Sequence, residues 1–192
     1  MPRQNLLFFR SKSKAGSLDE KGVIQACLDG DRQAFERIVD TYRDQVYWIA
    51  YRLVLDSEDA RDVAQHAFLN LWKSLPDYDF TKSFSGWVSK ITANCAIDSL
   101  RSRKPSDPLT DVSVEGSAID RNMDVRKIFE RVAPMLSERQ RVVLVLREIQ
   151  EMEFAEIAEI LHVTESTARN LLSQAKESFR KKAKELFPTY GL

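Results

Sequence analysis

Apolar residues recur at helical spacing along most of this 192-residue chain, and this periodicity constrains the fold more than any other feature. In one long stretch they fall three or four positions apart: Phe35, Ile38, Val39, Tyr42, Val46, Ile49, Ala50 and Leu53. Such spacing places side chains on one face of a helix with 3.6 residues per turn. Alternation of apolar and polar residues, which would indicate strands, is scarce. The sequence therefore predicts an all-α protein.

The first block of the chain predicts four helices. Ser17 and Glu20 have capping-box spacing, Asp31 precedes the long apolar stretch, and the acid-rich DSEDARD begins at Asp56. The third helix has a predicted buried stripe of Val63, Ala67, Phe68, Leu71, Trp72 and Leu75. We expect helices over about 17–28, 31–53, 56–75 and 85–102, with an aromatic-rich loop, PDYDFTKSFSG, between the last two.

A stretch without a helical stripe separates this block from a second one. The segment KPSDPLTDVSVEGSAIDRN is rich in Pro, Gly, Ser and Asp, and residues 105–124 carry five acids and one base. Such composition is typical of a linker. We therefore predict two small helical domains at 17–104 and 125–192. A flexible acidic linker at 105–124 joins them, and a disordered basic tail at 1–16 precedes them.

The second block ends in a pair of amphipathic helices. Ser137 and Gln140 form a capping box that begins an apolar helix through Leu146. The stretch EFAEIAEILHVTESTARNLLSQAKESFRKK then reads as two short helices with a four-residue join. Apolar residues of the second helix (Ala168, Leu171, Leu172, Ala175 and Phe179) would pack on those of the first (Phe154, Ile157, Ile160 and Leu161). This is the helix-turn-helix pattern.

Charge separates sharply within that pair, although the whole chain has a net charge of zero. Residues 148–165 contain six carboxylates and no Lys or Arg, whereas residues 166–186 contain six bases and two acids. A second helix that enters a DNA groove explains the separation, because Arg and Asn near its start can contact bases and cations near its end can contact phosphates. The alternative is that these cations only complement the helix dipole.

Other features exclude several classes of function. His66 and His162 have no second ligand or base at useful spacing, and no glycine-rich phosphate loop occurs. We predict no catalytic residue, cofactor site or metal site. Cys27 and Cys95 read as core residues in a reducing compartment. The apolar run Leu6–Phe9 is too short for a signal peptide, so we expect a cytoplasmic protein.

Longer stretches resemble a known family. LSERQRVVLVLREIQEMEFAEIAEILHVTESTARNLLSQAKESFRK resembles region 4 of bacterial sigma factors, and EDARDVAQHAFLNLWKSL followed by FSGWVSKITANCAIDSLRSRK resembles region 2. Both are similar to the extracytoplasmic-function (ECF) type, and the resemblance covers about residues 23–187. It implies a promoter-specificity subunit of RNA polymerase that is not itself an enzyme. Region 2 would span 17–104 and region 4 would span 125–192.

The resemblance also implies roles for individual residues. Contacts with core polymerase would come from Asp62, Gln65, His66 and Leu69. Melting and capture of the minus-ten element would involve Phe80, Lys82, Phe84, Trp87, Lys90, Asn94 and Arg101, because stacking platforms beside cations suit single-stranded DNA. The helix-turn-helix would read the minus-thirty-five element through Ser166, Thr167, Arg169, Asn170, Ser173, Arg180, Lys181 and Lys184. The implied partners are core RNA polymerase, promoter DNA and an anti-sigma factor, which is often a membrane protein in this family; no small-molecule substrate is implied.

Four positions depart from the family pattern, including Gln174 and Lys176, where the family often has arginines, and two other functions stay open. The family usually has an acid where His66 stands and often a glycine where His162 stands. The loop aromatics Tyr78, Phe80 and Phe84 can either close over the helical bundle or contact DNA.

A stand-alone helix-turn-helix regulator would explain the second block but leaves the first without a purpose. A helical adaptor that binds only proteins predicts no salt-dependent affinity for DNA.

Overall fold

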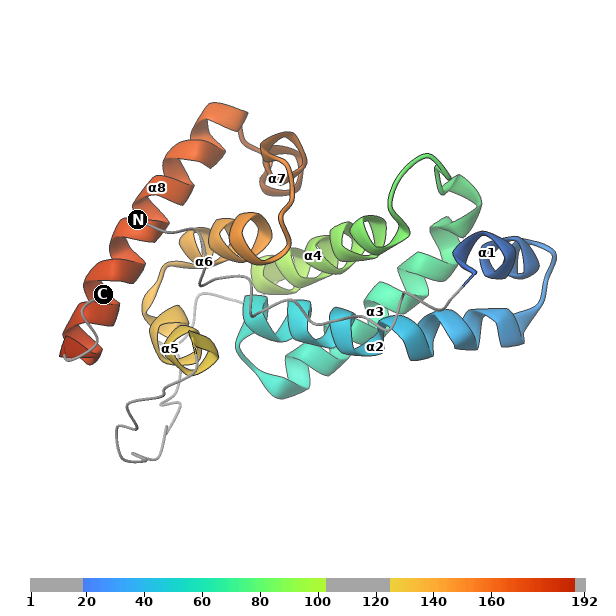
Figure 1. The fold of residues 1–192 in the computed structure, drawn as a ribbon, viewed down its shortest axis with the longest axis horizontal. Coiled ribbons are helices and arrows are strands. Elements are labelled where there is room, and N and C mark those ends of the chain that lie inside the picture. The colour runs from blue at the N-terminus through green and yellow to red at the C-terminus, as the bar shows by residue number, and fades with distance from the viewer. Residues whose placement is uncertain (1–18, 103–124, 189–192) are drawn as a thin grey trace. The chain divides into compact units, whose positions relative to one another are not determined.

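The computed structural model describes residues 19–102 and 125–188, and every regular element within these two ranges is a helix (Figure 1). The all-α prediction is confirmed for this part of the chain. The two ranges belong to different compact units, called here the N-terminal unit and the C-terminal unit. The predicted tail at 1–16 and the predicted linker at 105–124 lie outside the described residues, so their boundaries stay predictions.

The N-terminal unit is built from four α-helices and one short 3₁₀-helix. These are α1 (Glu20–Leu28), α2 (Arg32–Val54), α3 (Ser57–Ser74), the 3₁₀-helix Leu75–Asp77 and α4 (Phe84–Ser102). Helices α2, α3 and α4 pack on one another, and α1 packs on α2 (Figure 1). The predicted caps at Asp31 and Asp56 are confirmed, because both carboxylates accept hydrogen bonds from backbone N–H groups of the first helical turn.

The start of α1 differs from the prediction. Its N-cap is Asp19, whose carboxylate accepts a hydrogen bond from the backbone N–H of Gly22 at 3.1 Å. Ser17, the predicted cap, lies outside the described residues. An Asp adjacent to the first helical residue satisfies a free N–H of the first turn as well as Ser does, so sequence alone did not distinguish the two.

Aromatic rings form much of the core of the N-terminal unit. Tyr42 and Phe84 are almost fully buried, and their rings meet edge to face with centroids 5.4 Å apart. The prediction that Trp72 belongs to the buried stripe of α3 is wrong in part, because 38% of this residue is exposed. One edge of its ring packs on Phe35 at 4.8 Å. Size explains this result, since a tryptophan at the margin of a stripe seldom buries all of its ring.

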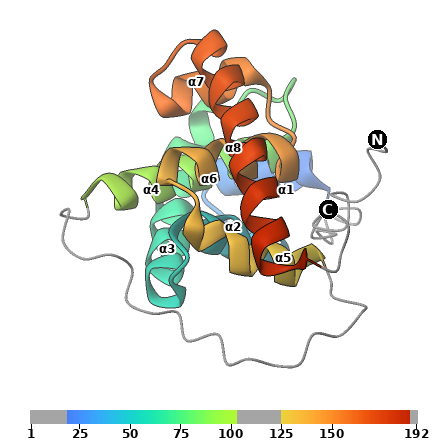
Figure 2. The same ribbon diagram turned by 90° about the vertical axis from the view of Figure 1, so that its left-hand side faces the viewer.

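The C-terminal unit consists of shorter helices packed on a long last one. These are α5 (Val125–Val132), a 3₁₀-helix (Ala133–Met135), α6 (Glu138–Leu144), a π-helical segment (Val145–Ile149), α7 (Phe154–Leu161) and α8 (Glu165–Leu186). Helices α6 and α7 both pack against α8 (Figure 2). The Ser137–Gln140 capping box is confirmed. The helix that it begins does not end near Leu146 as predicted, because the chain continues as the π-helical segment to Ile149.

The connection from α7 to α8 is a tight turn. His162 adopts a left-handed conformation with φ 53° and ψ 50°, and Thr164 caps α8. Only three residues, 162–164, join the helices, one fewer than predicted, because Glu165 already begins α8. The second helix is also long and not short, with 22 residues. Its predicted packing face is confirmed, since Ala168, Leu172 and Ala175 are buried.

Candidate functional site

The predicted DNA-reading residues share one side of α8. At 100° per residue, Ser166, Arg169, Asn170, Ser173, Arg180 and Lys184 fall within about 100° of the helix circumference, and Thr167 and Lys181 lie beside them. All eight are exposed, and the apolar residues of α8 face the other way. A 22-residue helix is about 33 Å long, so the two ends of this stripe can meet different parts of a DNA duplex.

The two ends of the stripe differ in how their side chains are held. The guanidinium of Arg169 pairs with Glu165 at 3.1 Å and lies 4.2 Å from the ring centroid of Phe154. The hydroxyl of Thr167 is 2.9 Å from that of Thr164, and its backbone N–H donates to the same cap. Thr167 therefore serves the start of the helix. Arg180, Lys181 and Lys184 project from the last two turns, where cations suit a phosphate backbone.

One basic residue of α8 is already paired within the protein. The ammonium of Lys176 lies 2.8 Å from the carboxylate of Glu148 in the π-helical segment. This contact between an acid of the first stretch and a base of the second had no signal in the sequence. It shows that part of the charge separation serves packing between the π-helical segment and α8.

A second stripe runs along α4 of the N-terminal unit. Trp87, Lys90, Asn94 and Arg101 recur at intervals of three, four and seven residues, which places them within about 60° on one face. Trp87 and Lys90 are half-buried, whereas Asn94 and Arg101 are exposed. Arg101 is 3.7 Å from Asp98 one turn earlier. An exposed ion pair of this length contributes little stability and leaves the guanidinium able to meet a phosphate.

The aromatic loop before α4 is fixed by Tyr78, one of the loop aromatics for which the sequence left open packing on the bundle or contact with DNA. The hydroxyl of Tyr78 donates a hydrogen bond to the carbonyl of Lys82 at 2.5 Å, and its ring packs against Phe80, Phe84 and Trp87. Burial raises the pKa of Tyr78, so the hydroxyl keeps its proton. Phe80 is 39% exposed beside it, and Lys82 is also exposed.

The structure corrects the prediction for Phe84. Only 1% of this residue is exposed, and its ring contacts Tyr42 and Tyr78 inside the core. A base cannot stack on a ring that is covered on all sides, so Phe84 belongs to the core and not to the DNA surface. The spacing of aromatics in the loop could not reveal which rings turn inward.

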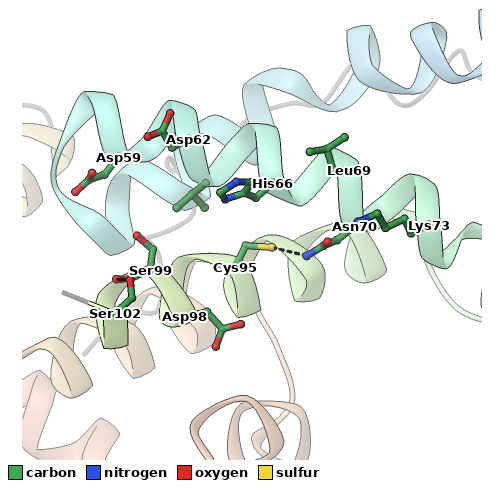
Figure 3. Close-up of a pocket in the computed structure, with 11 residues that line it drawn as sticks. Asp59, Asp62, His66, Leu69, Asn70, Lys73, Cys95, Asp98, Ser99 and Ser102 are labelled. Carbon is green, nitrogen blue, oxygen red and sulfur yellow. Dashed lines mark hydrogen bonds between the residues drawn. The ribbon is translucent and has the colours of Figure 1, made fainter. Parts of the chain in front are cut away.

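The predicted polymerase-binding residues lie on α3. Asp62, Gln65, His66 and Leu69 are all exposed, and Leu69 keeps 49% of its surface open. Three of them line a cleft of about 460 Å³ between α3 and α4 (Figure 3). Gln65 lies on the same helix but is not among the residues that line the cleft.

The far wall of the cleft was not predicted. It comes from Cys95, Asp98, Ser99 and Ser102 of α4, and Asn70 of α3 donates a hydrogen bond to the Cys95 sulfur at 3.3 Å (Figure 3). Burial raises the pKa of the Cys95 thiol, which therefore stays protonated and unreactive at neutral pH. An exposed leucine on a rim of carboxylates suits contact with another protein better than chemistry.

Comparison with known proteins identifies the family to which both units belong. The family model described as Sigma-70 region 2 matches residues 38–105, and the model described as Sigma-70, region 4 matches residues 126–179. The ECF RNA polymerase sigma factor SigW of Bacillus subtilis is 29% identical over 86% of this chain and 97% of its own length. This chain belongs to the ECF sigma factors. It is a promoter-specificity subunit of bacterial RNA polymerase, and the comparisons favour no other function.

Further relatives of this sigma factor agree. The ECF RNA polymerase sigma-E factor of Escherichia coli K12 is 26% identical over 88% of this chain and 96% of its own length. Among solved structures, the sigma factor RpoE of Bartonella quintana, crystallised with the anti-sigma factor NepR, has a TM-score of 0.60. It is 19% identical and covers 81% of this chain and 97% of that chain. At this identity the likeness supports the fold alone.

Neither a candidate metal site nor a candidate membrane-spanning helix occurs among the described residues of this sigma factor. Across residues 19–102 and 125–188, no three His, Cys, Asp or Glu side chains are grouped so that they could hold a metal ion. Within the same ranges, none of the helices combines the length and apolar character that a membrane span needs.

Proposed function

We propose that the two units of this sigma factor divide promoter recognition at the level of individual residues. The observation that carries the proposal is the pair of stripes on α4 and α8, the first partly exposed and the second exposed, each in the unit matched by the corresponding sigma region. One stripe combines aromatic and cationic groups and the other combines hydroxyl, amide and cationic groups. The first composition suits unpaired bases, and the second suits a duplex.

In the N-terminal unit, Asp62, Gln65, His66 and Leu69 bind core polymerase. Their exposure on α3 supports this role. Leu69 supplies an apolar side chain that is exposed to water in the free protein and would be buried in the complex. The minus-ten element is held by Phe80, Lys82, Trp87, Lys90, Asn94 and Arg101. The ring of Phe80 is the stacking platform, since it is the exposed member of the aromatic cluster around Tyr78.

In the C-terminal unit, the start of α8 reads the minus-thirty-five element. Arg169, Asn170, Ser173 and Ser166 meet base edges, and Thr167 holds the helix start. Arg180, Lys181 and Lys184 bind phosphates. The Thr164 cap and the short turn support this orientation, because they leave the first turn of α8 exposed.

The proposal extends to partners and compartment. The relative from Bartonella quintana was crystallised with an anti-sigma factor, and we propose that an anti-sigma factor also restrains this protein. It acts in the cytoplasm, where the polymerase and the chromosome meet. The sigma factor itself catalyses no reaction, since polymerase supplies the chemistry of RNA synthesis.

Run-off transcription tests the function directly. Purified core polymerase with this protein should start transcripts at a defined set of genomic sites, and sequencing of their 5′ ends would give both promoter elements. Core polymerase alone is the control. A gel shift with and without core polymerase tests the alternative of a stand-alone regulator, which would bind its sites equally well without polymerase. Transcription that starts at the same sites without the protein would contradict the proposal.

A further inference from the structure

Phe154, the first residue of α7, lies against two guanidinium groups from different parts of the C-terminal unit. The Cζ atom of Arg169 on α8 is 4.2 Å from the ring centroid, and that of Arg147 in the π-helical segment is 4.9 Å away. Both distances are within the range in which a ring face attracts a cation. The ring therefore connects a residue that is proposed to read DNA with a segment that is not.

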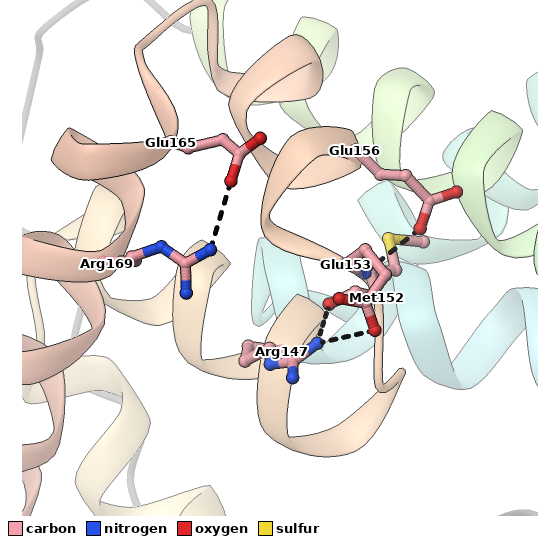
Figure 4. A network of polar contacts seen from close by, with 6 residues as sticks. All are labelled: Arg147, Met152, Glu153, Glu156, Glu165 and Arg169. Atoms are coloured by element: carbon pink, nitrogen blue, oxygen red, sulfur yellow. Dashed lines mark hydrogen bonds and ion pairs between the residues drawn. The ribbon is translucent and has the colours of Figure 1, made fainter.

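Arg147 is held firmly on its side of the ring. Its Nη1 atom donates hydrogen bonds to the backbone carbonyl of Met152 at 2.6 Å and to the carboxylate of Glu153 at 3.3 Å (Figure 4). Only 30% of the Arg147 side chain is exposed. Glu156 accepts a hydrogen bond from the backbone N–H of Glu153 and completes the capping box of α7. These contacts fix the start of α7, and with it the position of the Phe154 ring.

Arg169 is exposed but not free to turn in all directions. Its side chain keeps 58% of its surface open, while Glu165 one turn earlier accepts a hydrogen bond from its Nη2 atom at 3.1 Å (Figure 4). The ring of Phe154 and the carboxylate of Glu165 together limit the rotamers of this long side chain. Immobilising such a side chain on binding costs free energy, and limiting its freedom beforehand reduces that cost.

We propose that Phe154 is a specificity-determining residue that positions Arg169 for base recognition without touching DNA itself. The inference rests on the proposed role of Arg169 at the minus-thirty-five element. Phe154 holds the guanidinium near the reading position before DNA arrives. The discrimination that Arg169 provides at one base pair therefore depends on an aromatic side chain of the preceding helix.

The test measures selectivity base pair by base pair. Holoenzyme assembled from core polymerase and the full-length chain is bound to duplexes that carry one mapped promoter with randomised minus-thirty-five positions, and the bound fraction is sequenced. Phe154→Leu and Phe154→Met keep apolar volume at the helix interface but remove the ring. Each should reduce selectivity about two- to fivefold, and only at the base pair that Arg169→Ala also affects. Phe154→Tyr keeps the ring and should preserve selectivity.

A double substitution separates positioning from a merely structural role. In an Arg169→Ala background, Phe154→Leu should cause no further loss of selectivity, and the salt dependence of binding should stay unchanged. Equal losses at every base pair, unchanged selectivity or tighter binding in both ring-deleted variants would overturn the inference while leaving the role of Arg169 intact. If Arg169→Ala changes selectivity nowhere, the proposed role of Arg169 is wrong, and the inference is overturned with it.

Discussion

Different kinds of contact hold the two proposed DNA surfaces of this sigma factor in place. On the N-terminal unit, Phe80 packs on the buried ring of Tyr78, and Trp87 packs on the buried rings of Tyr78 and Phe84. On the C-terminal unit, the start of α8 is held at the surface by the Thr164 cap and the Glu165–Arg169 ion pair. Buried rings contribute several kcal/mol to folding, whereas surface caps and ion pairs contribute about 1 kcal/mol or less each.

The difference has a practical meaning for mutational studies. In the N-terminal unit, the proposed DNA contacts Phe80 and Trp87 also pack on core rings, so a lost activity can reflect a lost fold. In the C-terminal unit the two are separable, because the residues proposed to contact DNA are exposed. All three tryptophans lie in the N-terminal unit, at positions 48, 72 and 87, so tryptophan fluorescence follows the unfolding of that unit selectively.

The largest effect should come from Phe84→Ala. Removing a fully buried ring should lower the free energy of unfolding of the N-terminal unit by about 3–5 kcal/mol, as measured by denaturant titration with tryptophan fluorescence. Phe84→Leu is the control and should cost clearly less. If Phe84→Ala instead unfolds like wild type but fails to open duplex promoters, Phe84 contacts DNA after all and the comparison fails.

The next effect distinguishes the two ends of α8. Asn170→Ala should weaken holoenzyme binding to the preferred minus-thirty-five element by about 1–3 kcal/mol and have little effect on a scrambled element. Lys184→Ala should weaken both alike and reduce the salt slope by about one unit. Binding is measured on both elements across salt concentrations. A change of sequence preference in Lys184→Ala would show that α8 lies in the groove the other way round.

A third prediction concerns a tyrosine in the core of the N-terminal unit. The buried Tyr42 hydroxyl donates a hydrogen bond to the carboxylate of Glu20, which ties α1 to α2. Tyr42→Phe should lower the free energy of unfolding by about 1–2 kcal/mol at neutral pH. Substituting Tyr47, which is half-exposed on the same helix, with Phe is the matched control and should have little effect.

The loss in Tyr42→Phe should depend on pH. Burial first, and the hydrogen bond to Glu20 second, raise the pKa of Tyr42 above that of an unfolded tyrosine. The resulting stability is fully present below a pH of about 10 and decreases as the pH rises toward the folded pKa. The difference between wild type and Tyr42→Phe should therefore narrow above pH 10. A constant difference from pH 7 to pH 11 would argue against a raised pKa of Tyr42 in the folded protein.

The smallest effect tests whether the partly exposed Lys176–Glu148 ion pair of the C-terminal unit is dispensable for its fold. Glu148→Gln removes the partner of Lys176 and should cost less than about 1 kcal/mol of stability. The released ammonium should strengthen binding to scrambled DNA and steepen the salt slope by up to about one unit. Lys176→Gln should do the reverse. A large loss of stability in Glu148→Gln would show that the C-terminal unit, like the N-terminal one, depends for its fold on residues next to its proposed DNA surface.

Local signals predicted much of this architecture. Asp31, Asp56 and Ser137 each stand immediately before a helix, as their hydrogen-bonding side chains indicated. The buried face of α8 followed from its helical spacing. The exposed residues of its other face followed too, because an amphipathic helix has only one apolar side. Their roles on DNA stay predictions.

The rest depended on contacts between elements. Nothing in the order of residues shows that Phe84 turns inward while Phe80 turns outward, since that depends on the space above Tyr42. Likewise, the Phe154–Arg169 contact joins two helices, and the π-helical segment at 145–149 is an irregularity that helical periodicity does not reveal. His162, at a position where the family often has a glycine, adopts a left-handed conformation in which glycine would be less strained.

The self-contained core of the N-terminal unit bears on how the protein is synthesised. Its cluster of buried residues extends from Val23 to Val88, and its last helix ends at Ser102. The ribosome adds about 5–20 residues per second, so the 90 residues between position 102 and position 192 take about 5–20 s to translate. Helical domains with local contacts fold within microseconds to milliseconds. The proposed polymerase-binding face can therefore be complete on a nascent chain seconds before the proposed DNA-reading helix, α8, has been made.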